Sequence, residues 1–357
     1  MKAALRSIGT ATPRFGMTQQ QCWSFAVDVT GCTGQKARTI RALYRLSGIE
    51  RRGLTIATPE GSQNLYARAA THDGPTTAER LSRYLADASA LAIESCREAL
   101  ARARVQPDEI THLVCCSCTG FEAPGIDQAV IRSLGLSLGV QRTMIGFMGC
   151  HAAINALRVA RGLALAESNA RVLVCATEVC SLHFSYAGRP DRDVANALFA
   201  DGSAACVVTG VEEPPCPALE LAGFSARLWP EAADEMSWRI GDHGFEMGLS
   251  QSVLDRLAAG TRDWIVPWLS GCGLSIADVG GWAIHPGGPR IVRAVRESLA
   301  LDEEKVGPSL EVLRRHGNMS SPTVLFILEA LARTNTPRPW VAVAFGPGLA
   351  GEAVLIE

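Results

Sequence analysis

Hydrophobic residues recur along the first half of the chain with two spacings, one typical of helices and one typical of buried strands. Helical spacing over 85–105 precedes an apolar run at 111–117. A second apolar run at 139–147 precedes an alanine- and leucine-rich helical stretch at 149–168, and the buried run RVLVCATE follows at 171–178. Strands that alternate with helices in this way predict a parallel sheet.

The second half of the chain repeats this order. Its predicted elements are a strand, two helices and two closing strands, at 280–286, 289–301, 318–334, 340–348 and 351–357. The stretch VEEPPCPALE at 211–220 holds three prolines that break regular structure, so it is the expected seam. We therefore predict two similar α/β halves, residues 1–212 and 213–357.

Composition narrows the class of protein. Of 357 residues, 47% are hydrophobic and 20% are charged, which is typical of a folded globular protein with a large core. The charged residues are scattered along the chain and sum to a net charge of −2, which gives no reason to expect nucleic acid as a partner. Without an apolar run of roughly 20 residues or a signal-peptide core, we expect no membrane insertion and a cytoplasmic location with reduced cysteines.

Cys150 lies where a strand meets a helix. It follows an apolar strand and Gly149, and it opens the helical stretch at 149–168. A thiol at this elbow faces the positive end of the helix dipole, which favours the thiolate, while the glycine permits a tight turn. The alternative is a buried structural cysteine, which is common at such junctions.

Two further residues complete a set of nucleophile, base and amide donor. His285 ends the predicted strand WAIHP, and ligand sites in α/β proteins gather at the carboxyl ends of strands. Asn318 lies between Gly317 and a long apolar helix, where a helix cap is the competing interpretation. Together with Cys150 they form a candidate catalytic trio.

The other histidines have ordinary explanations as surface or packing residues. His316 is the strongest competitor because it lies close to Asn318, and His183 follows a core strand where it can line a pocket. The cysteines at 115, 116 and 118 lack a second Cys or His pair at zinc spacing, so no metal is expected.

Five segments, taken in order, carry a resemblance: GFMGCHAA, LFADGSAA, WAIHPGGP, HGNMSSPTVLFIL and AFGPGL. They resemble the chalcone synthase-like type III polyketide synthases, which belong to the thiolase-like condensing enzymes. The stretch MSWRIGDHGFEMGLS is similar to bacterial members that make alkylpyrones and alkylresorcinols. The resemblance implies a thiolase-like fold, two similar α/β halves packed as an αβαβα layered core, and a homodimer.

The resemblance also implies roles for the trio. Cys150 would take an acyl group from an acyl-CoA starter, with His285 holding it as thiolate. His285 and Asn318 would hydrogen-bond the malonyl-CoA thioester carbonyl and stabilise the enolate formed by loss of carbon dioxide. Repeated Claisen steps would then build a polyketide that cyclises to a pyrone, resorcinol or related aromatic product, with no metal or redox cofactor.

Family positions around the trio imply a substrate pocket. Phe199 matches a gatekeeper phenylalanine, and Met247 stands at the second such position with Phe245 two residues earlier. The other positions that the resemblance assigns to the cavity are Cys118, His183, Ser320, Gly346, Pro347 and Gly348. Plain core packing is the alternative for Phe199, and a buried thiol is the alternative for Cys118.

Arginines near the amino terminus are candidates for binding coenzyme A phosphates. Arg38, Arg41 and Arg45 have a spacing that places them on one helix face. A solvated face is the alternative, and Arg51 and Arg52 are alternative phosphate ligands.

Three rival functions stay open beside a type III polyketide synthase. One is a single condensation like that of ketoacyl-ACP synthase III, and another is a tetrahydroxynaphthalene-type synthase that uses malonyl-CoA only. The third is a thiolase-fold binding protein without activity. A complete Cys150, His285 and Asn318 set argues against the third.

Overall fold

The computed structural model describes residues 1–67, 74–186, 189–211 and 219–357. Most strands join one nine-stranded sheet in the order β11-β12-β13-β8-β1-β7-β6-β4-β5, and two small antiparallel pairs, β10-β9 and β2-β3, lie outside it. The strands are β1 (Lys2–Ala11), β2 (Gly16–Thr18), β3 (Arg51–Gly53), β4 (His112–Ser117), β5 (Gln141–Gly146), β6 (Arg171–Val179), β7 (Asp201–Val211), β8 (Leu219–Leu228), β9 (Met236–Gly241), β10 (Gly244–Leu249), β11 (Gly281–Ile284), β12 (Trp340–Gly346) and β13 (Ala350–Ile356).

Helices connect these strands and cover both outer faces. The α-helices are α1 (Gln19–Thr30), α2 (Gly34–Leu46), α3 (Thr77–Ala103), α4 (Ile126–Leu134), α5 (Ala152–Ala166), α6 (Pro190–Leu198), α7 (Ser252–Gly271), α8 (Pro289–Leu299), α9 (Glu303–His316) and α10 (Thr323–Arg333). Two short 3₁₀ turns matter for the site, η2 (Gly149–His151) and η3 (Cys180–His183). The helix α3 begins eight residues before its predicted start at 85 because Thr76 and Glu79 form a capping box there.

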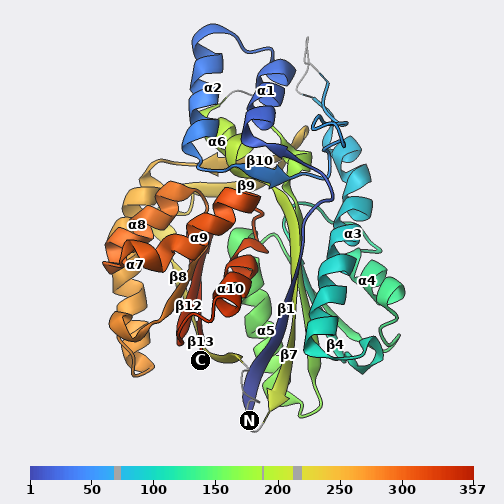
Figure 1. Cartoon of the computed structure of the whole chain (residues 1–357), viewed down its shortest axis with the longest axis vertical. Coiled ribbons are helices and arrows are strands. Elements are labelled where there is room, and N and C mark those ends of the chain that lie inside the picture. Colours follow the sequence, from blue (N-terminus) through green and yellow to red (C-terminus); the bar gives the residue numbers. More distant parts are fainter. Residues whose placement is uncertain (68–73, 187–188, 212–218) are drawn as a thin grey trace.

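The sheet consists of two parts that are joined weakly. The strands β1, β7, β6, β4 and β5 form the N-terminal blade, and the strands β8, β13, β12 and β11 form the C-terminal blade. Strands β1 and β8 pair through two residue pairs only, Ala4 with Glu220 and Leu5 with Leu219. The helices α5 and α10 lie between the blades, α3 and α4 cover one outer face, and α7 and α8 cover the other (Figure 1). The predicted α/β fold with five layers is confirmed.

The two middle helices form the central core. α10 presents Val324, Leu325, Ile327 and Leu328 with no exposed surface, because both of its sides meet a sheet or another helix. This burial on every side explains why its sequence is apolar without helical periodicity. No helix in the described part of the chain combines the length and apolarity that crossing a bilayer requires.

The direction of the strands differs from the prediction of a parallel sheet. The pairs β4-β5, β4-β6 and β11-β12 are parallel, while the pairs that involve β1, β7, β8 or β13 are antiparallel. β12 and β13 are joined by three residues only, and so short a link permits only an antiparallel pair. The sheet is therefore mixed.

The predicted seam at 211–220 lies mostly outside the described residues. β7 ends at Val211 and β8 begins at Leu219, and the prolines of the stretch fall between them. The division into halves at 212 and 213 thus stays a prediction.

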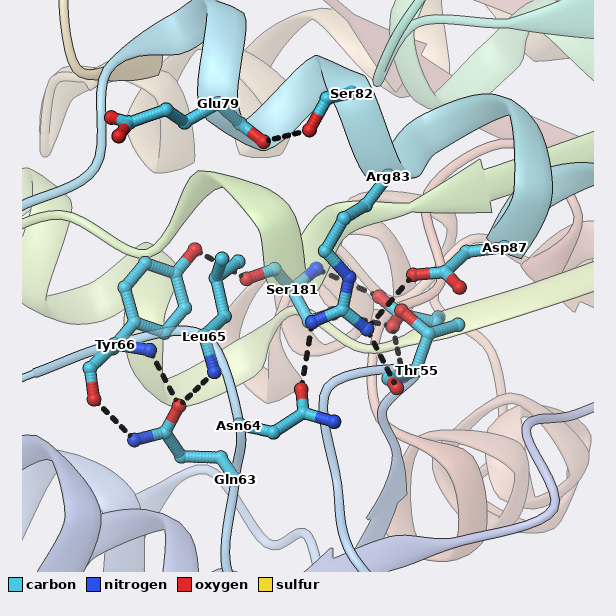
Figure 2. Close-up of polar contacts among 11 residues, drawn as sticks. Thr55, Gln63, Asn64, Leu65, Tyr66, Glu79, Ser82, Arg83, Asp87 and Ser181 are labelled. Carbon is cyan, nitrogen blue, oxygen red and sulfur yellow. Dashed lines mark hydrogen bonds and ion pairs between the residues drawn. The ribbon is translucent and has the colours of Figure 1, made fainter.

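Side chains far apart in sequence tie the segment that precedes α3 to the pocket region. Tyr66 donates its hydroxyl to the carbonyl of Ser181 at 2.7 Å, and Arg83 on α3 donates to Asn64 Oδ1 at 2.7 Å (Figure 2). Thr55 N donates to the buried carboxylate of Asp201 at 2.6 Å. These bonds hold η3, which carries Ser181, against the rest of the N-terminal blade.

Candidate active site

Cys150 lies on the predicted strand-to-helix elbow. The chain leaves β5, adopts a left-handed conformation at Phe147 (φ 57°) and Gly149 (φ 75°), and enters α5 through η2. A Cβ atom on Gly149 would lie 2.3 Å from Pro347 Cδ. Glycine is therefore required twice over, for the backbone angle and for the close approach of the turn after β12.

The thiol of Cys150 is half-buried, and Ser320 Oγ lies 3.5 Å from its sulfur. Burial raises the pKa of Cys150 to about 12, the hydrogen bond from Ser320 lowers it, and the nearby carboxylate of Glu178 raises it. This differs from the expectation of a thiolate. Desolvation of a charged sulfur outweighs the field of the helix N-terminus in the ligand-free protein.

His285 directly follows β11, and its backbone N donates to Val343 O on β12 at 2.8 Å. The side chain is 2% exposed, yet neither ring nitrogen has a hydrogen-bond partner among the described residues. Burial, with a smaller contribution from the charge of His151, lowers the pKa of His285 to about 3. A buried imidazole with two unpaired nitrogens carries a free-energy cost that a bound substrate could relieve.

Asn318 lies in the extended segment between α9 and α10. It forms an isolated parallel bridge with Phe199, and its Oδ1 accepts from Ser320 N at 2.8 Å. The helix-cap interpretation is wrong, because α10 begins only at Thr323 and Pro322 stands at its N-cap. The side chain instead orders the segment that delivers Ser320 to the sulfur of Cys150.

Ser320 links two members of the trio, and the third is positioned by the neighbouring strands. Ser320 contacts Cys150 on one side and the Asn318 side chain on the other. His285 enters from β11, whose neighbour β12 ends in the turn that packs on Gly149. Among the described residues no hydrogen bond joins Cys150 to His285 directly.

A narrow pocket of about 40 Å³ has Phe199 in its wall, and Phe199 pairs through its backbone with Asn318, although no member of the trio lines the pocket itself. Of the sequence-predicted pocket residues, Phe199, His183, Phe245 and Met247 line it. Cys118 and Ser320 do not line it, but Cys118 contacts the lining residue Trp238, and its Sγ lies 3.4 Å from Ser320 Oγ.

The turn Gly346, Pro347 and Gly348 does not line the pocket. It packs on the Cys150 elbow instead.

His183 is a fixed structural link within this wall. Its Nε2 donates to Thr119 O at 2.6 Å, and its Nδ1 accepts from Phe245 N at 3.0 Å. The imidazole stacks on the Phe245 ring with centroids 4.2 Å apart. Burial lowers the pKa of His183 to about 3, so the ring is neutral at physiological pH.

Sequence reasoning missed two wall residues. Trp238 lines the pocket and donates from Nε1 to Cys118 O at 2.7 Å. Arg52 is 4% exposed and donates to Asn196 O and Phe199 O at 2.8 and 2.7 Å. Arg52 therefore holds the Phe199 segment in place. Its buried guanidinium is not free to bind a coenzyme A phosphate, so this alternative is wrong.

Glu178 was also missed. This fully buried carboxylate accepts from Thr119 Oγ1 at 2.7 Å, from Ser321 Oγ at 2.5 Å and from Cys118 N at 2.9 Å. Burial raises its pKa. The sequence does contain a signal for it, because Glu178 stands inside the apolar strand RVLVCATEV. A glutamate is rarely buried unless other groups pair with its carboxylate.

The three candidate phosphate ligands lie on α2 and are exposed. Arg38 donates to Gln35 Oε1, and the Arg41 guanidinium lies 4.9 Å from the Trp23 ring. Arg45 stands in the last turn, and the opposite face of the helix buries Ile40 and Tyr44. This outward face is compatible with both earlier interpretations, a phosphate site and a solvated surface.

Comparison with known proteins gives one consistent result. The family model for the N-terminal domain of chalcone and stilbene synthases matches residues 1–212, and that for the C-terminal domain matches residues 220–357. The alpha-pyrone synthesis polyketide synthase-like Pks18 of Mycobacterium tuberculosis is 31% identical over 363 residues, covering 99% of this chain and 91% of the relative. The 3,5-dihydroxyphenylacetyl-CoA synthase of Streptomyces toyocaensis is 31% identical, covering 98% and 88%.

Solved structures agree with these relatives. The crystal structure of PKS-I from the brown alga Ectocarpus siliculosus superposes with a TM-score of 0.93 at 28% identity, covering 100% of this chain and 98% of that one. A fungal type III polyketide synthase, ORAS, gives a TM-score of 0.88 at 26% identity, covering 100% of each chain. With both halves matched by sequence and by fold, the chain belongs to the chalcone and stilbene synthase family and is a type III polyketide synthase, an acyltransferase.

Proposed function

We propose that Cys150 accepts the starter acyl group from coenzyme A and that malonyl-CoA then extends it by repeated decarboxylative condensation. The observation that carries this proposal is the buried His285 ring, which has two unpaired nitrogens in a site where Ser320 connects Cys150 to Asn318. Such a ring is suited to hydrogen-bond a thioester carbonyl that enters the site.

The acylation step needs a proton acceptor because the thiol is neutral at rest. As the acyl-CoA thioester binds, the Cys150 proton passes to His285, and the sulfur attacks the carbonyl carbon. The thioester C–S bond breaks, and coenzyme A leaves as a thiol with the proton that His285 carried. The acyl group remains on Cys150.

The extension step uses His285 and Asn318 as donors. Their N–H groups stabilise the enolate oxygen that malonyl-CoA develops as its carboxylate leaves as carbon dioxide. The enolate carbon attacks the acyl carbonyl on Cys150, and the sulfur leaves as thiolate. The product is a β-ketoacyl-CoA two carbons longer, ready to reload.

The wall around Phe199 sets which chains fit. Phe199, Trp238, Phe245 and Met247 are flexible or aromatic apolar groups around a narrow pocket, and we assign to them the selection of starter and chain length. The two relatives described above are named for pyrone synthesis and for a dihydroxyphenyl product, so we expect a pyrone, a resorcinol or a related aromatic polyketide. Coenzyme A phosphates are assigned to the α2 face at Arg38, Arg41 and Arg45.

A homodimer is also proposed, through β5. This strand ends the sheet order, so one of its edges has no partner within the described chain, and five of its six residues are exposed. Met144, Met148 and Phe121 are 48%, 39% and 54% exposed beside it. An exposed apolar edge strand favours pairing with a second copy.

We place the protein in the cytoplasm. All cysteines in the described residues are free thiols, which fits a reducing compartment.

Mass spectrometry of products tests the proposal. Purified protein receives malonyl-CoA alone and then with short, long and aromatic acyl-CoA starters, with Cys150→Ala as the control. We expect multiply extended pyrones or resorcinols, lost in the variant. Full product formation by Cys150→Ala would refute the nucleophile, and a singly extended product that needs acyl carrier protein would favour the single-condensation rival.

A further inference from the structure

His151 follows the nucleophile and is not used by the proposed reaction. It is 2% exposed, and its Nδ1 lies 2.7 Å from Asn155 Oδ1. Asn155 Nδ2 donates to Glu352 Oε1 at 2.9 Å, and Glu352 forms an ion pair with Arg158. A chain of polar contacts therefore runs from the active-site elbow to the half-buried guanidinium of Arg158.

This series of polar contacts connects the two halves of the molecule. His151, Asn155 and Arg158 follow at i, i+4 and i+7, so they share one face at the start of α5. Glu352 lies on β13, in the segment matched by the C-terminal family model. The contacts thus set how the segment that bears Cys150 sits on the C-terminal blade.

The hydrogen-bond pattern fixes which ring nitrogen of His151 is protonated. An ion-paired carboxylate only accepts hydrogen bonds, so the Asn155 atom that faces Glu352 must be the amide nitrogen. Its oxygen then faces His151, and His151 Nδ1 must donate. In the neutral ring Nε2 consequently keeps its lone pair.

The ring lies against the strand end that borders the site. A Cβ atom on Gly346 would lie 2.5 Å from His151 Cδ2 and 2.8 Å from Nε2, so only glycine admits the imidazole there. Gly346 ends β12, the strand whose Val343 carbonyl holds the backbone of His285. His151 and His285 are thereby attached to the same strand.

Charge at His151 also reaches His285. Burial lowers the pKa of His151, Asn155 and Glu352 raise it, and Arg158 lowers it. A positive His151 lowers the pKa of His285 and opposes the transfer of the Cys150 proton to it. A neutral His151 avoids this repulsion.

We propose that His151 is a positioning residue of the reacting centre, held as the neutral Nδ1–H tautomer by Asn155, Glu352 and Arg158 so that Cys150 and His285 keep their register. The inference rests on the proposed function, since it assigns a supporting role within the same site.

The test exchanges the two charged residues, Arg158 and Glu352, that end this series of contacts. In the double variant Arg158→Glu with Glu352→Arg, the ion pair is kept, but β13 now carries a group that only donates. Asn155 must turn its oxygen toward it and present its amide nitrogen to His151. The proton of His151 then moves to Nε2, while the charges and the packing of the protein are otherwise conserved.

Two measurements are made on this double variant, on His151→Phe and on wild type. Histidine ring ¹⁵N spectra, assigned with His151→Phe, should show the Nδ1–H form in wild type and the Nε2–H form in the exchange variant. Condensation kcat should fall about 10- to 100-fold in both variants, as expected when reacting groups lose their register. The KM for malonyl-CoA should stay unchanged, since no substrate contact is removed.

Arg161→Gln is the matched control, because Arg161 lies on the same helix and donates to Leu221 O without touching Glu352. It should retain wild-type kcat. An Nε2–H form in wild type, or a wild-type kcat in an exchange variant whose tautomer has changed, would overturn the proposal. A wild-type protein that forms no polyketide from any starter would instead refute the proposed function.

Discussion

The protonation state of Cys150 is the most direct test of the site's electrostatics. The perturbation is pH, and the assay is the rate at which iodoacetamide alkylates Cys150, followed by mass spectrometry of the peptide that contains it. Alkylation proceeds through the thiolate. With the pKa of Cys150 raised to about 12 by burial, the rate should rise about tenfold per pH unit from pH 7 to pH 10, without a plateau.

The magnitude follows from the two shifted groups. The pKa of the thiol is about 12 and that of the His285 ring about 3, so moving the proton between them costs about 12 kcal/mol at roughly 1.36 kcal/mol per unit. Even opposite charges brought to about 4 Å of each other would regain only about 4 kcal/mol at the effective dielectric of a protein. The resting pair is therefore neutral, and a bound thioester must complete the ion pair.

A plateau in the alkylation rate below pH 8 would refute this reasoning, because it would show a resting thiolate paired with an imidazolium. The variant His285→Gln separates the two cases. If Cys150 and His285 are both neutral at rest, the variant should leave the pH dependence of the alkylation rate unchanged in the ligand-free enzyme. If they form an ion pair, the variant should remove the plateau. The exposed Cys272 serves as an internal reference for reagent and unfolding.

Three further predictions concern stability, the pocket wall and assembly. Burial raises the pKa of Asp201 to about 6, so the free energy of unfolding should fall by about 3 kcal/mol as pH rises from 4 to 6; urea titrations should show this slope in wild type and not in Asp201→Asn. His183→Leu removes the link between Thr119 and Phe245 and should shift the distribution of product lengths, whereas His183→Gln, which can donate and accept, should shift it less; chromatography with mass spectrometry measures both. Met144→Lys puts a charge on the exposed edge of β5 and should convert the proposed dimer to monomer in analytical ultracentrifugation, while a dimer that persists in the variant would contradict an interface at β5.

The fold could be predicted because its signals are local. Apolar runs and helical spacing along the chain are direct consequences of burial on one or both faces, and the elements they indicate appear in the structure. The direction of the strands could not be predicted in the same way. β7 runs antiparallel to β6 although the helix α6 separates them, and this depends on where η3 and α6 carry the chain rather than on spacing.

The candidate site also combines residues whose positions the sequence predicts with residues whose positions it does not. The positions of Cys150 and His285 in the fold could be predicted because each stands where an element ends, and a strand end is visible in sequence. Arg52 was misread as a surface ligand because charge in a sequence suggests exposure, whereas this guanidinium is buried against the carbonyls of Asn196 and Phe199. Contacts between segments more than a hundred residues apart leave no periodic trace in the sequence.

The protonation state of Cys150 depends on burial, which the position of the residue at a helix N-terminus does not reveal. A helix N-terminus favours an anion, but the cost of removing a thiolate from water is larger when the sulfur is packed against Ser320 and near the carboxylate of Glu178. The helix field is consequently insufficient by itself. Both ring nitrogens of His285 lack a partner among the described residues, so in the proposed mechanism substrate binding and activation of Cys150 become one event, which would restrict nucleophilic attack to a site that already holds its substrate.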